Sequence, residues 1–154
     1  GGLWFAEEFI PGREFNISII ADGKGGANIL PVAEMTYQQQ PLAARLIDYA
    51  AKWDEDAPEY NAFERRFDFG AEDSFLIKKL RELTLNCWEG FCLSGAARVD
   101  FRVSEAGEIF ILEVNANPCL SPDAGLAAAA EQAGLSYAEL ILGLASAEQK
   151  KKAA

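Results

Sequence analysis

Hydrophobic and polar residues alternate most regularly over residues 97–118, ARVDFRVSEAGEIFILEVNANP. In the first half of this stretch, alternation places Val99, Phe101 and Val103 on one face of a strand and charged residues on the other. Gly107 indicates a tight turn, after which a second apolar run continues to Val114. The pattern therefore predicts a β-hairpin with one hydrophobic and one charged face on its first strand.

The pairing of these two strands decides which side chains share a face. Alternation places Arg98, Asp100 and Arg102 together on the first strand. On the second strand it separates two sets, Phe110, Leu112 and Val114 on one face and Ile109, Ile111, Glu113 and Asn115 on the other. If a two- or four-residue loop joins the strands, Arg98 faces Glu113 and Asp100 faces Ile111. Asp100 and Glu113 then become diagonal neighbours about 7–8 Å apart, whereas a three-residue loop would break this shared face.

Shorter runs with the same period precede the hairpin. Residues 3–10 form a strand-like run, and residues 14–20 alternate with Phe15, Ile17 and Ile19 on the inner face. Glycines within residues 22–26 predict a hairpin turn. A phosphate loop is disfavoured, because no lysine-serine or lysine-threonine pair follows these glycines and no helix starts there. Residues 27–37 predict a third strand, in which Pro31 indicates an edge or a bulge.

A helical period begins after a long irregular segment, Gln38–Ala71. Over residues 72–92 the spacing of apolar residues predicts an amphipathic helix with a buried stripe and Trp88 beside it. The stripe consists of Leu76, Leu80, Leu83, Cys87 and Phe91. An alanine-rich helix is expected over residues 123–133, with Gly134 as its C-terminal cap. Ser136 and Glu139 form a capping-box pattern for a last helix that starts at Tyr137.

The order of these elements predicts the fold class. Three strands, an irregular segment, a helix, a hairpin and two helices are typical of an α+β fold, with a mainly antiparallel sheet flanked by helices. The 154 residues suffice for one domain with a sizeable core, and half of them are hydrophobic. Since no shift in composition divides the chain, we expect one domain over residues 1–154.

Charge and composition exclude several classes of function. The net charge of −10 argues against nucleic acid as a partner, because phosphate backbones need basic patches. The chain has no histidine, which excludes histidine-based triads and imidazole zinc sites. Three cysteines without metal spacing favour reduced thiols. No apolar run is long enough to span a membrane, so we expect a cytoplasmic protein with no membrane partner.

Asp100, Glu113 and Asn115 would bring two carboxylates and a carboxamide to one otherwise apolar face. Such groups are costly to bury without a partner, and a hard divalent cation such as Mg²⁺ supplies one through oxygen ligands. The alternative is a half-solvated hairpin in which Arg98 pairs with Glu113. Spacing alone leaves both interpretations open.

Three separated motifs occur along the chain, namely EEFIPGREF at residues 7–15, ARVDF with ILEVNANP within residues 97–118, and AGLSYAELI at residues 133–141. In these motifs the chain resembles the ATP-grasp ligases, and in particular the carboxy-terminal half of the D-alanine–D-alanine ligases. The resemblance covers nearly the whole chain and implies the ATP-grasp carboxy-terminal subdomain. Because the chain starts at Gly1 without a methionine, we expect a fragment of a longer ligase whose amino-terminal domains lie elsewhere.

The family activates a carboxylate as an acyl phosphate that an amine then attacks, so the resemblance implies ATP and Mg²⁺, or Mn²⁺, as cofactors. It implies Asp100, Glu113 and Asn115 as metal ligands, and Arg98 as the group that stabilises charge on the reacting atoms. Lys52 matches a loop lysine that reaches the nucleotide phosphates and contributes to catalysis. The other nucleotide-binding residues that the resemblance implies are Glu7 beside the adenine amino group, Glu8, Phe9, Ile10, Glu14 at the ribose, and Leu112. Without the resemblance, Glu7 and Glu14 would be interpreted as ordinary surface strand residues, whereas for Lys52 a solvated lysine in an acidic loop and a phosphate-binding lysine would both stay open.

Three positions depart from the family pattern. Trp53 replaces a tyrosine, Cys119 replaces a glycine, and Ala124-Gly125 replaces the Ser-Leu pair that holds the acceptor's carboxylate. We therefore expect an ATP-dependent C–N bond-forming ligase for small-molecule carboxylate and amine substrates, with an altered acceptor site. The alternatives are a degenerate, non-catalytic nucleotide-binding module and an acidic interaction domain. We expect little or no turnover from this chain alone, and a homodimer is one option for its assembly.

Overall fold

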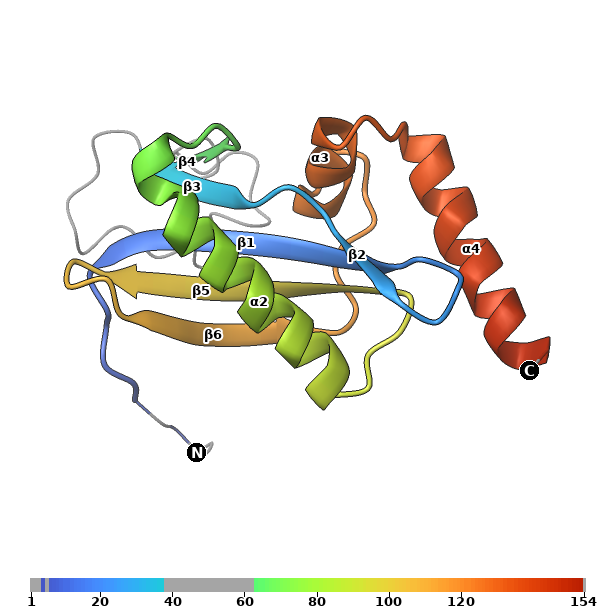
Figure 1. Ribbon diagram of the computed structural model, residues 1–154, viewed down its shortest axis with the longest axis horizontal. Helices are drawn as coiled ribbons and strands as arrows, with labels where there is room; N and C mark the ends of the chain where they lie inside the picture. Colours follow the sequence, from blue (N-terminus) through green and yellow to red (C-terminus); the bar gives the residue numbers. More distant parts are fainter. Residues whose placement is uncertain (1–3, 5, 38–62, 154) are drawn as a thin grey trace.

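The computed structural model describes residue 4, residues 6–37 and residues 63–153. Six strands form one antiparallel sheet in the order β4-β3-β1-β5-β6, with β2 also paired to β1. The strands are β1 (Gly12–Ala21), β2 (Ala27–Ile29), β3 (Ala33–Tyr37), β4 (Phe63–Arg66), β5 (Ala96–Ser104) and β6 (Ile109–Asn115). The helices are the 3-10 turn η2 (Ala71–Asp73), α2 (Ser74–Gly90), α3 (Gly125–Gln132) and α4 (Tyr137–Ala153). Figure 1 shows α2 lying across one face of the sheet, and the predicted α+β class is confirmed.

Strand β1 lies at the centre of the sheet, and its sequence explains this position. Phe15, Ile17 and Ile19 alternate with polar residues and are completely buried, as predicted. β1 pairs with β5 at every position from Gly12 to Ile20, and it also pairs with β2 and β3. The side chains that point away from the core are therefore held on a strand with hydrogen-bonded neighbours along its whole length.

Three predictions for the first half of the chain need correction. The strand predicted over residues 27–37 is two strands, because Pro31 lies between β2 and β3 and has no N–H to donate. Residues 6–11 form no strand, since Pro11 also lacks a donor and the chain bends at Gly12, whose φ is +139°. The segment predicted to be irregular contains β4, which pairs with β3. The rest of that segment, residues 38–62, lies outside the described residues.

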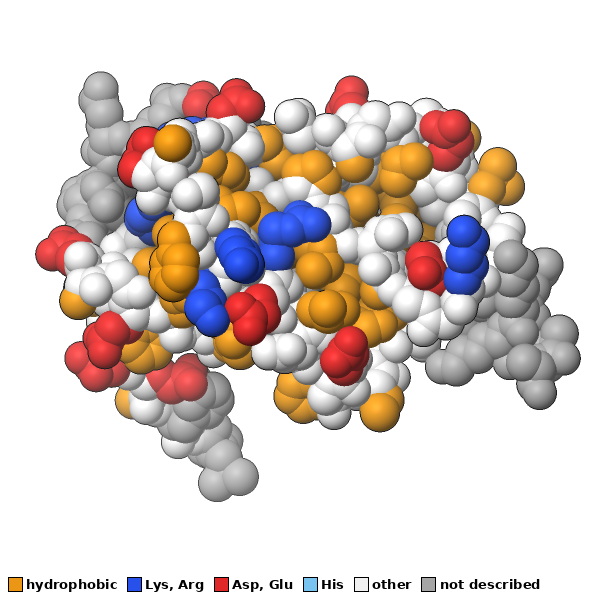
Figure 2. Space-filling model, viewed as in Figure 1, with side chains coloured by type: hydrophobic (Ala, Val, Ile, Leu, Met, Phe, Trp, Pro, Cys, Tyr) orange, Lys and Arg blue, Asp and Glu red, His pale blue; other side chains and the backbone are white. Residues whose placement is uncertain are grey.

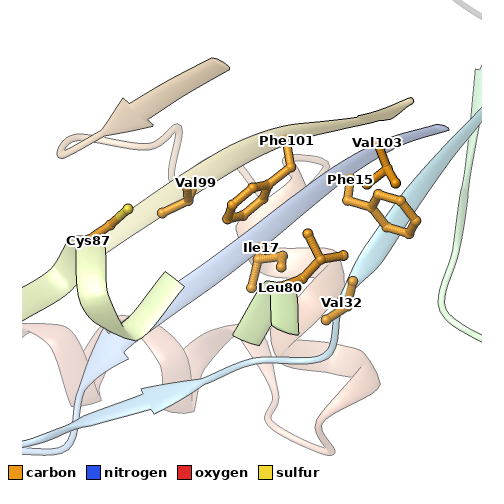
Figure 3. Packing of buried hydrophobic residues seen from close by; sticks show 8 residues of the cluster. All are labelled: Phe15, Ile17, Val32, Leu80, Cys87, Val99, Phe101 and Val103. Atoms are coloured by element: carbon orange, nitrogen blue, oxygen red, sulfur yellow. The ribbon is translucent and has the colours of Figure 1, made fainter. Parts of the chain in front are cut away.

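The main hydrophobic core lies between α2 and the sheet. Its buried members are Phe15, Ile17, Val32, Leu80, Cys87, Val99, Phe101 and Val103 (Figure 3). The predicted stripe on α2 is mostly correct, and Trp88 is buried as well. Phe91 was wrongly included in the stripe: α2 ends at Gly90, and the Phe91 side chain is 66% exposed. Burial of this apolar surface is the main force that holds α2 on the sheet.

The second core packs α3 and α4 against the other face of the sheet. Leu126 of α3 and Leu140 of α4 are buried in it, together with Leu30. Ile20 and Ala96 pack against this cluster, and they are paired across β1 and β5 on the face opposite Ile17 and Ile19. Helix α3 thus covers this face at the Ile20–Ala96 end of β1 and β5. It does not cover the residues nearer the other end of the two strands.

The predicted helix caps are confirmed, although α3 is shorter than expected. Gly134 has φ +81°, and the Leu135 N–H donates to the carbonyl of Ala130 at 2.9 Å, which closes the end of α3. At the start of α4, the Ser136 N–H donates to Oε2 of Glu139 at 2.8 Å, as a capping box requires. The helix predicted over residues 123–133 begins only at Gly125.

A β-bulge interrupts the pairing of β5 with β6. Val103 pairs with Ile109, one residue beyond the Glu108 expected for a four-residue loop. Phe101 pairs with Ile111 but Asp100 pairs with Glu113, so Leu112 is an extra residue. The bulge places Val114 on the same face as Ile109, and both pack against the α2 core. The predicted division of β6 into two faces is therefore wrong: Val114 does not share a face with Phe110.

Four charged residues form a network where the sheet meets the start of α2. Arg13 donates to Glu34 at 2.7 Å and to Asp73 at 2.5 Å, and Arg66 also donates to Glu34. Burial alone would raise the pKa of Glu34, but the hydrogen bonds from both arginines outweigh it and hold that pKa below its usual value. The bond from Arg13 likewise lowers the pKa of Asp73. We call these four residues the clamp, since they join β1, β3, β4 and η2.

Figure 2 shows the outer surface on the α2 side of the molecule, where Lys and Arg side chains gather over α2. The basic residues of this helix include Lys78, Lys79 and Arg81. Arg81 donates to the carbonyls of Leu30 and Ile29 at 3.3 and 3.4 Å, so it ties α2 to the end of β2. Within the described part of the chain, no helix is long and apolar enough to cross a membrane.

Candidate functional site

The charged side chains predicted on β5 lie on the face of the sheet opposite α2. The polar residues of β1 also lie on this face, because they alternate with Phe15 and Ile17, which point into the core. The antiparallel register places these residues side by side across the two strands, as Glu14 with Arg102, Asn16 with Asp100, and Ser18 with Arg98. We call this surface the site face.

Strand β6 adds the remaining candidate metal ligands to the site face. Asp100 lies directly opposite Glu113, and Arg98 lies directly opposite Asn115. The predicted pairs, Asp100 with Ile111 and Arg98 with Glu113, are wrong. The pairing register is shifted by one residue at the turn, and the extra residue Leu112 shifts it by one more. A total shift of two residues keeps each side chain on its face, so Asp100, Glu113 and Asn115 do share one face.

Arg98 forms an ion pair along its own strand. Its Nε lies 2.8 Å from Oδ1 of Asp100, and its Nη2 lies 2.8 Å from Oδ2 of the same carboxylate. Burial alone would lower the pKa of Arg98, but Asp100 and, more weakly, Glu113 and Glu14 outweigh it and raise that pKa. The alternative in which Arg98 pairs with Glu113 is not the arrangement found, and Arg98 stays charged beside the carboxylates.

The oxygen atoms on this face suit a hard cation. Two carboxylates that face each other across a strand pair repel, and a divalent cation would relieve that repulsion. Oδ1 of Asn115 accepts the N–H of Asn117 at 3.0 Å, and a carbonyl oxygen has a second lone pair for another partner. Among the described residues no three acidic, cysteine or histidine side chains gather into a metal cluster. Two carboxylates and one carboxamide match the way Mg²⁺ is usually held, with phosphate oxygens and water completing its shell.

The predicted adenine-binding segment reaches the site face just before β1. Glu7 and Glu8 are exposed in a stretch without regular structure, followed by Phe9 and the partly exposed Ile10. Gly12 sets the path of this segment, because a Cβ on it would lie 2.0 Å from the carbonyl oxygen of Val103 on β5. A glycine is thus required where the segment crosses the end of β5.

Glu14 and Arg102 form a buried ion pair beside that segment. The Arg102 Nη2 lies 2.9 Å from Oε2 of Glu14, and the two residues are only 4% and 8% exposed, respectively. The guanidinium carbon of Arg102 lies 5.2 Å from the centre of the Phe9 ring. Sequence reasoning did not single out Arg102, although an arginine between the apolar Phe101 and Val103 of a central strand was a signal of a specific partner.

Those of the remaining site predictions that the structure describes lie on β6 or between β6 and α3. Leu112 is the bulge residue and is 54% exposed. Cys119 is exposed, and hydrogen bonding to Ser121 lowers the pKa of its thiol. Ala124 precedes the first residue of α3 and makes no side-chain cap there. Lys52 and Trp53 lie outside the described residues.

Comparisons with known proteins agree with this geometry. The family model described as D-ala D-ala ligase C-terminus matches residues 4–146. The D-alanine–D-alanine ligase of Aquifex aeolicus is 34% identical over 135 residues, which cover 88% of this chain and 40% of that protein. The chain thus spans about two fifths of the length of this curated relative.

Two solved structures share the fold. The D-alanine–D-alanine ligase of Bacillus anthracis complexed with ATP matches with a TM-score of 0.68 and 22% identity, over 96% of this chain and 42% of that one. The VanG D-Ala:D-Ser ligase of Enterococcus faecalis matches with a TM-score of 0.63 and 20% identity, over 91% of this chain and 37% of that one.

An antiparallel sheet with helices on both faces, arranged as in these ligases, defines the carboxy-terminal subdomain of an ATP-grasp protein. More specifically, the chain belongs to the D-alanine–D-alanine ligase C-terminal family. The resemblance stated from its motifs is therefore confirmed.

Proposed function

We propose that this chain is the ATP- and Mg²⁺-binding carboxy-terminal part of a carboxylate–amine ligase that works through an acyl phosphate. The observation that carries the proposal is the alignment of Asp100 opposite Glu113 and Arg98 opposite Asn115 on one face of the sheet. Membership of the ligase family supports the same function. The remaining domains of the ligase would supply the donor site and close over the site face.

Each side chain has a distinct task in this proposal. Asp100, Glu113 and Asn115 would hold the metal, which when bound neutralises the charge of the nucleotide phosphates. Arg98 would hold the reacting carboxylate and phosphate oxygens, because a guanidinium stays charged and bonds through two N–H groups. Its place beside Asp100, at 2.8 Å, puts that charge next to the metal ligands. Glu14 would accept hydrogen bonds from the ribose hydroxyls.

Calorimetric titration of the full-length protein with a non-hydrolysable ATP analogue, with and without Mg²⁺, tests the proposal. We expect Mg²⁺-dependent binding that Glu113→Gln weakens at least about tenfold, since one of two metal carboxylates is lost. Glu108→Gln is the matched control, because this exposed acid lies in the turn of the same hairpin. Equal affinities of wild type and Glu113→Gln would contradict the placement of the metal site.

The acceptor substrate need not be D-alanine. Ala124, which precedes α3, makes no side-chain cap, and neither Ala124 nor Gly125 has a side chain that can donate a hydrogen bond to a carboxylate. The fold also occurs in a protein named D-Ala:D-Ser ligase, so it serves more than one acceptor. The same observation favours a second candidate, a degenerate module that binds ATP without ligation. Release of ADP by the full-length protein on addition of amino acids would separate the two, and we expect little or none from this chain alone.

A further inference from the structure

The Glu14–Arg102 pair has no evident role in holding the sheet together. The two residues are directly opposite on β1 and β5, which are already paired at every position from Gly12 to Ile20. A buried ion pair contributes little net stability, because the desolvation of both charges offsets their attraction. A guanidinium and a carboxylate nearly closed off from solvent in this place therefore call for another explanation.

Arg102 contacts both Glu14 of β1 and Phe9 of the irregular segment before β1, and no strand pairing links these two to each other. The edge of its guanidinium donates to Glu14 at 2.9 Å, while Phe9 offers the ring against which the same group lies, 5.2 Å from its centre. Phe9 belongs to a segment without regular structure, so it has no ladder to fix its distance from Glu14. A planar guanidinium bonds at its edge and stacks on its face at once, which a lysine ammonium does not.

We infer that Arg102 is a positioning residue of the nucleoside half of the site, which sets the spacing between the Phe9 segment and Glu14 and so selects the adenosine part of the nucleotide. This inference rests on the proposed function, in which Glu14 binds the ribose, and on the adenine-binding role that the resemblance implies for the Phe9 segment. Arg102 lies two residues after Asp100 on the same face of β5, so it stands between the metal ligands and the adenine segment. Arg102 thus acts through its neighbours and touches neither the metal nor the reacting phosphate.

The test compares three probes on the full-length protein in the presence of Mg²⁺, namely an ATP analogue, its 2′-deoxy form and inorganic tripolyphosphate. Arg102→Lys keeps the charge but removes the guanidinium that lies 5.2 Å from the centre of the Phe9 ring. Arg81→Lys makes the same change on the other side of the sheet as a control. We expect Arg102→Lys to bind the ATP analogue about tenfold more weakly and to lose most of its preference over the 2′-deoxy form, because Glu14 is misplaced. Tripolyphosphate, which has no nucleoside, should bind within about twofold of wild type.

The outcomes are distinguishable from a failure of the proposed function. An equal loss for the ATP analogue and tripolyphosphate, or no loss for either, would overturn the inference, because Arg102 would then act on the fold or not at all. A wild-type protein that binds neither probe would instead overturn the proposed function. If Arg102→Lys does not fold, Phe9→Leu removes the stacking partner without exposing a buried charge. It should weaken the ATP analogue about threefold and leave tripolyphosphate unchanged, and equal effects on both would again contradict the inference.

Discussion

The two faces of one sheet carry charged residues in different ways. On the α2 side, the clamp of Arg13, Glu34, Arg66 and Asp73 joins three strands and the turn before α2. At the candidate metal ligands of the site face, away from the Glu14–Arg102 pair, Arg98 pairs with Asp100, which is its neighbour two residues along the same strand. The first arrangement links parts of the chain that are distant in sequence, whereas the second links residues whose spacing the strand already fixes.

This difference separates charges that serve the fold from charges that, in the proposed function, serve a ligand. Glu34 is satisfied by two arginines from different strands, so it has its partners within the chain. Asp100 has one arginine and faces a second carboxylate, Glu113. Like charges placed opposite each other cost stability, so their presence on the site face indicates a requirement other than stability.

The largest effect is expected at the clamp. Glu34→Gln removes the charge that both arginines share and should lower the free energy of unfolding by about 2 kcal/mol, a value reduced because both arginines are partly exposed. Urea denaturation at neutral pH measures this change. Nucleotide binding by the folded variant should stay as in wild type. A variant as stable as wild type would show that the clamp does not hold β1, β3 and β4 to η2.

The same residue should give a smaller effect as the solution becomes acidic. The folded-state pKa of Glu34 lies below its usual value of about 4.3, so its stabilising contribution is complete above that value and is lost as the pH falls through the folded-state pKa. The stability difference between wild type and Glu34→Gln should thus be constant above about pH 5 and shrink below about pH 4. Denaturation series across this range would show it, and a difference independent of pH would exclude Glu34 as the titrating group.

The smallest effect on stability is expected on the site face. Glu113→Gln removes the repulsion with Asp100 together with the weaker attraction to Arg98, so the free energy of unfolding should change by less than about 0.5 kcal/mol. Denaturation of this variant beside Glu34→Gln places the two faces on one scale. A loss as large as that of Glu34→Gln would mean that Glu113 serves the fold, and the contrast between the faces would disappear.

The sequence pattern predicted the parts of the fold that have a strict period. Phe15, Ile17 and Ile19 alternate without interruption, and the α2 stripe up to Cys87 follows the helical spacing, so both were predicted correctly. Strand β4 was missed because FERR is short and charged, as edge strands often are. The register of β6 was missed because Ile109 to Leu112 are all apolar, and such a run does not show where an extra residue lies.

Candidate site residues that belong to a sequence motif were identified from the sequence, whereas those defined by a contact between distant residues were missed. Asp100, Glu113 and Asn115 were identified from their family motifs and the strand period, and the structure brings them to one face. Arg102 and the clamp depend on which residues distant in sequence meet, such as Arg13 with Asp73, sixty residues apart. Spacing along the chain contains no such information, because these partners lie on elements that meet only when the sheet and α2 have assembled.

The bulge at Leu112 has a consequence for how this strand tolerates insertions and deletions. Ile109 before the bulge and Val114 after it both reach the α2 core, while Glu113 and Asn115 stay on the site face. Deletion of Leu112 would turn Glu113 toward the hydrophobic core and Val114 toward the site face. The strand can therefore change length between its two ends only by an even number of residues if it is to keep both its packing and its chemistry.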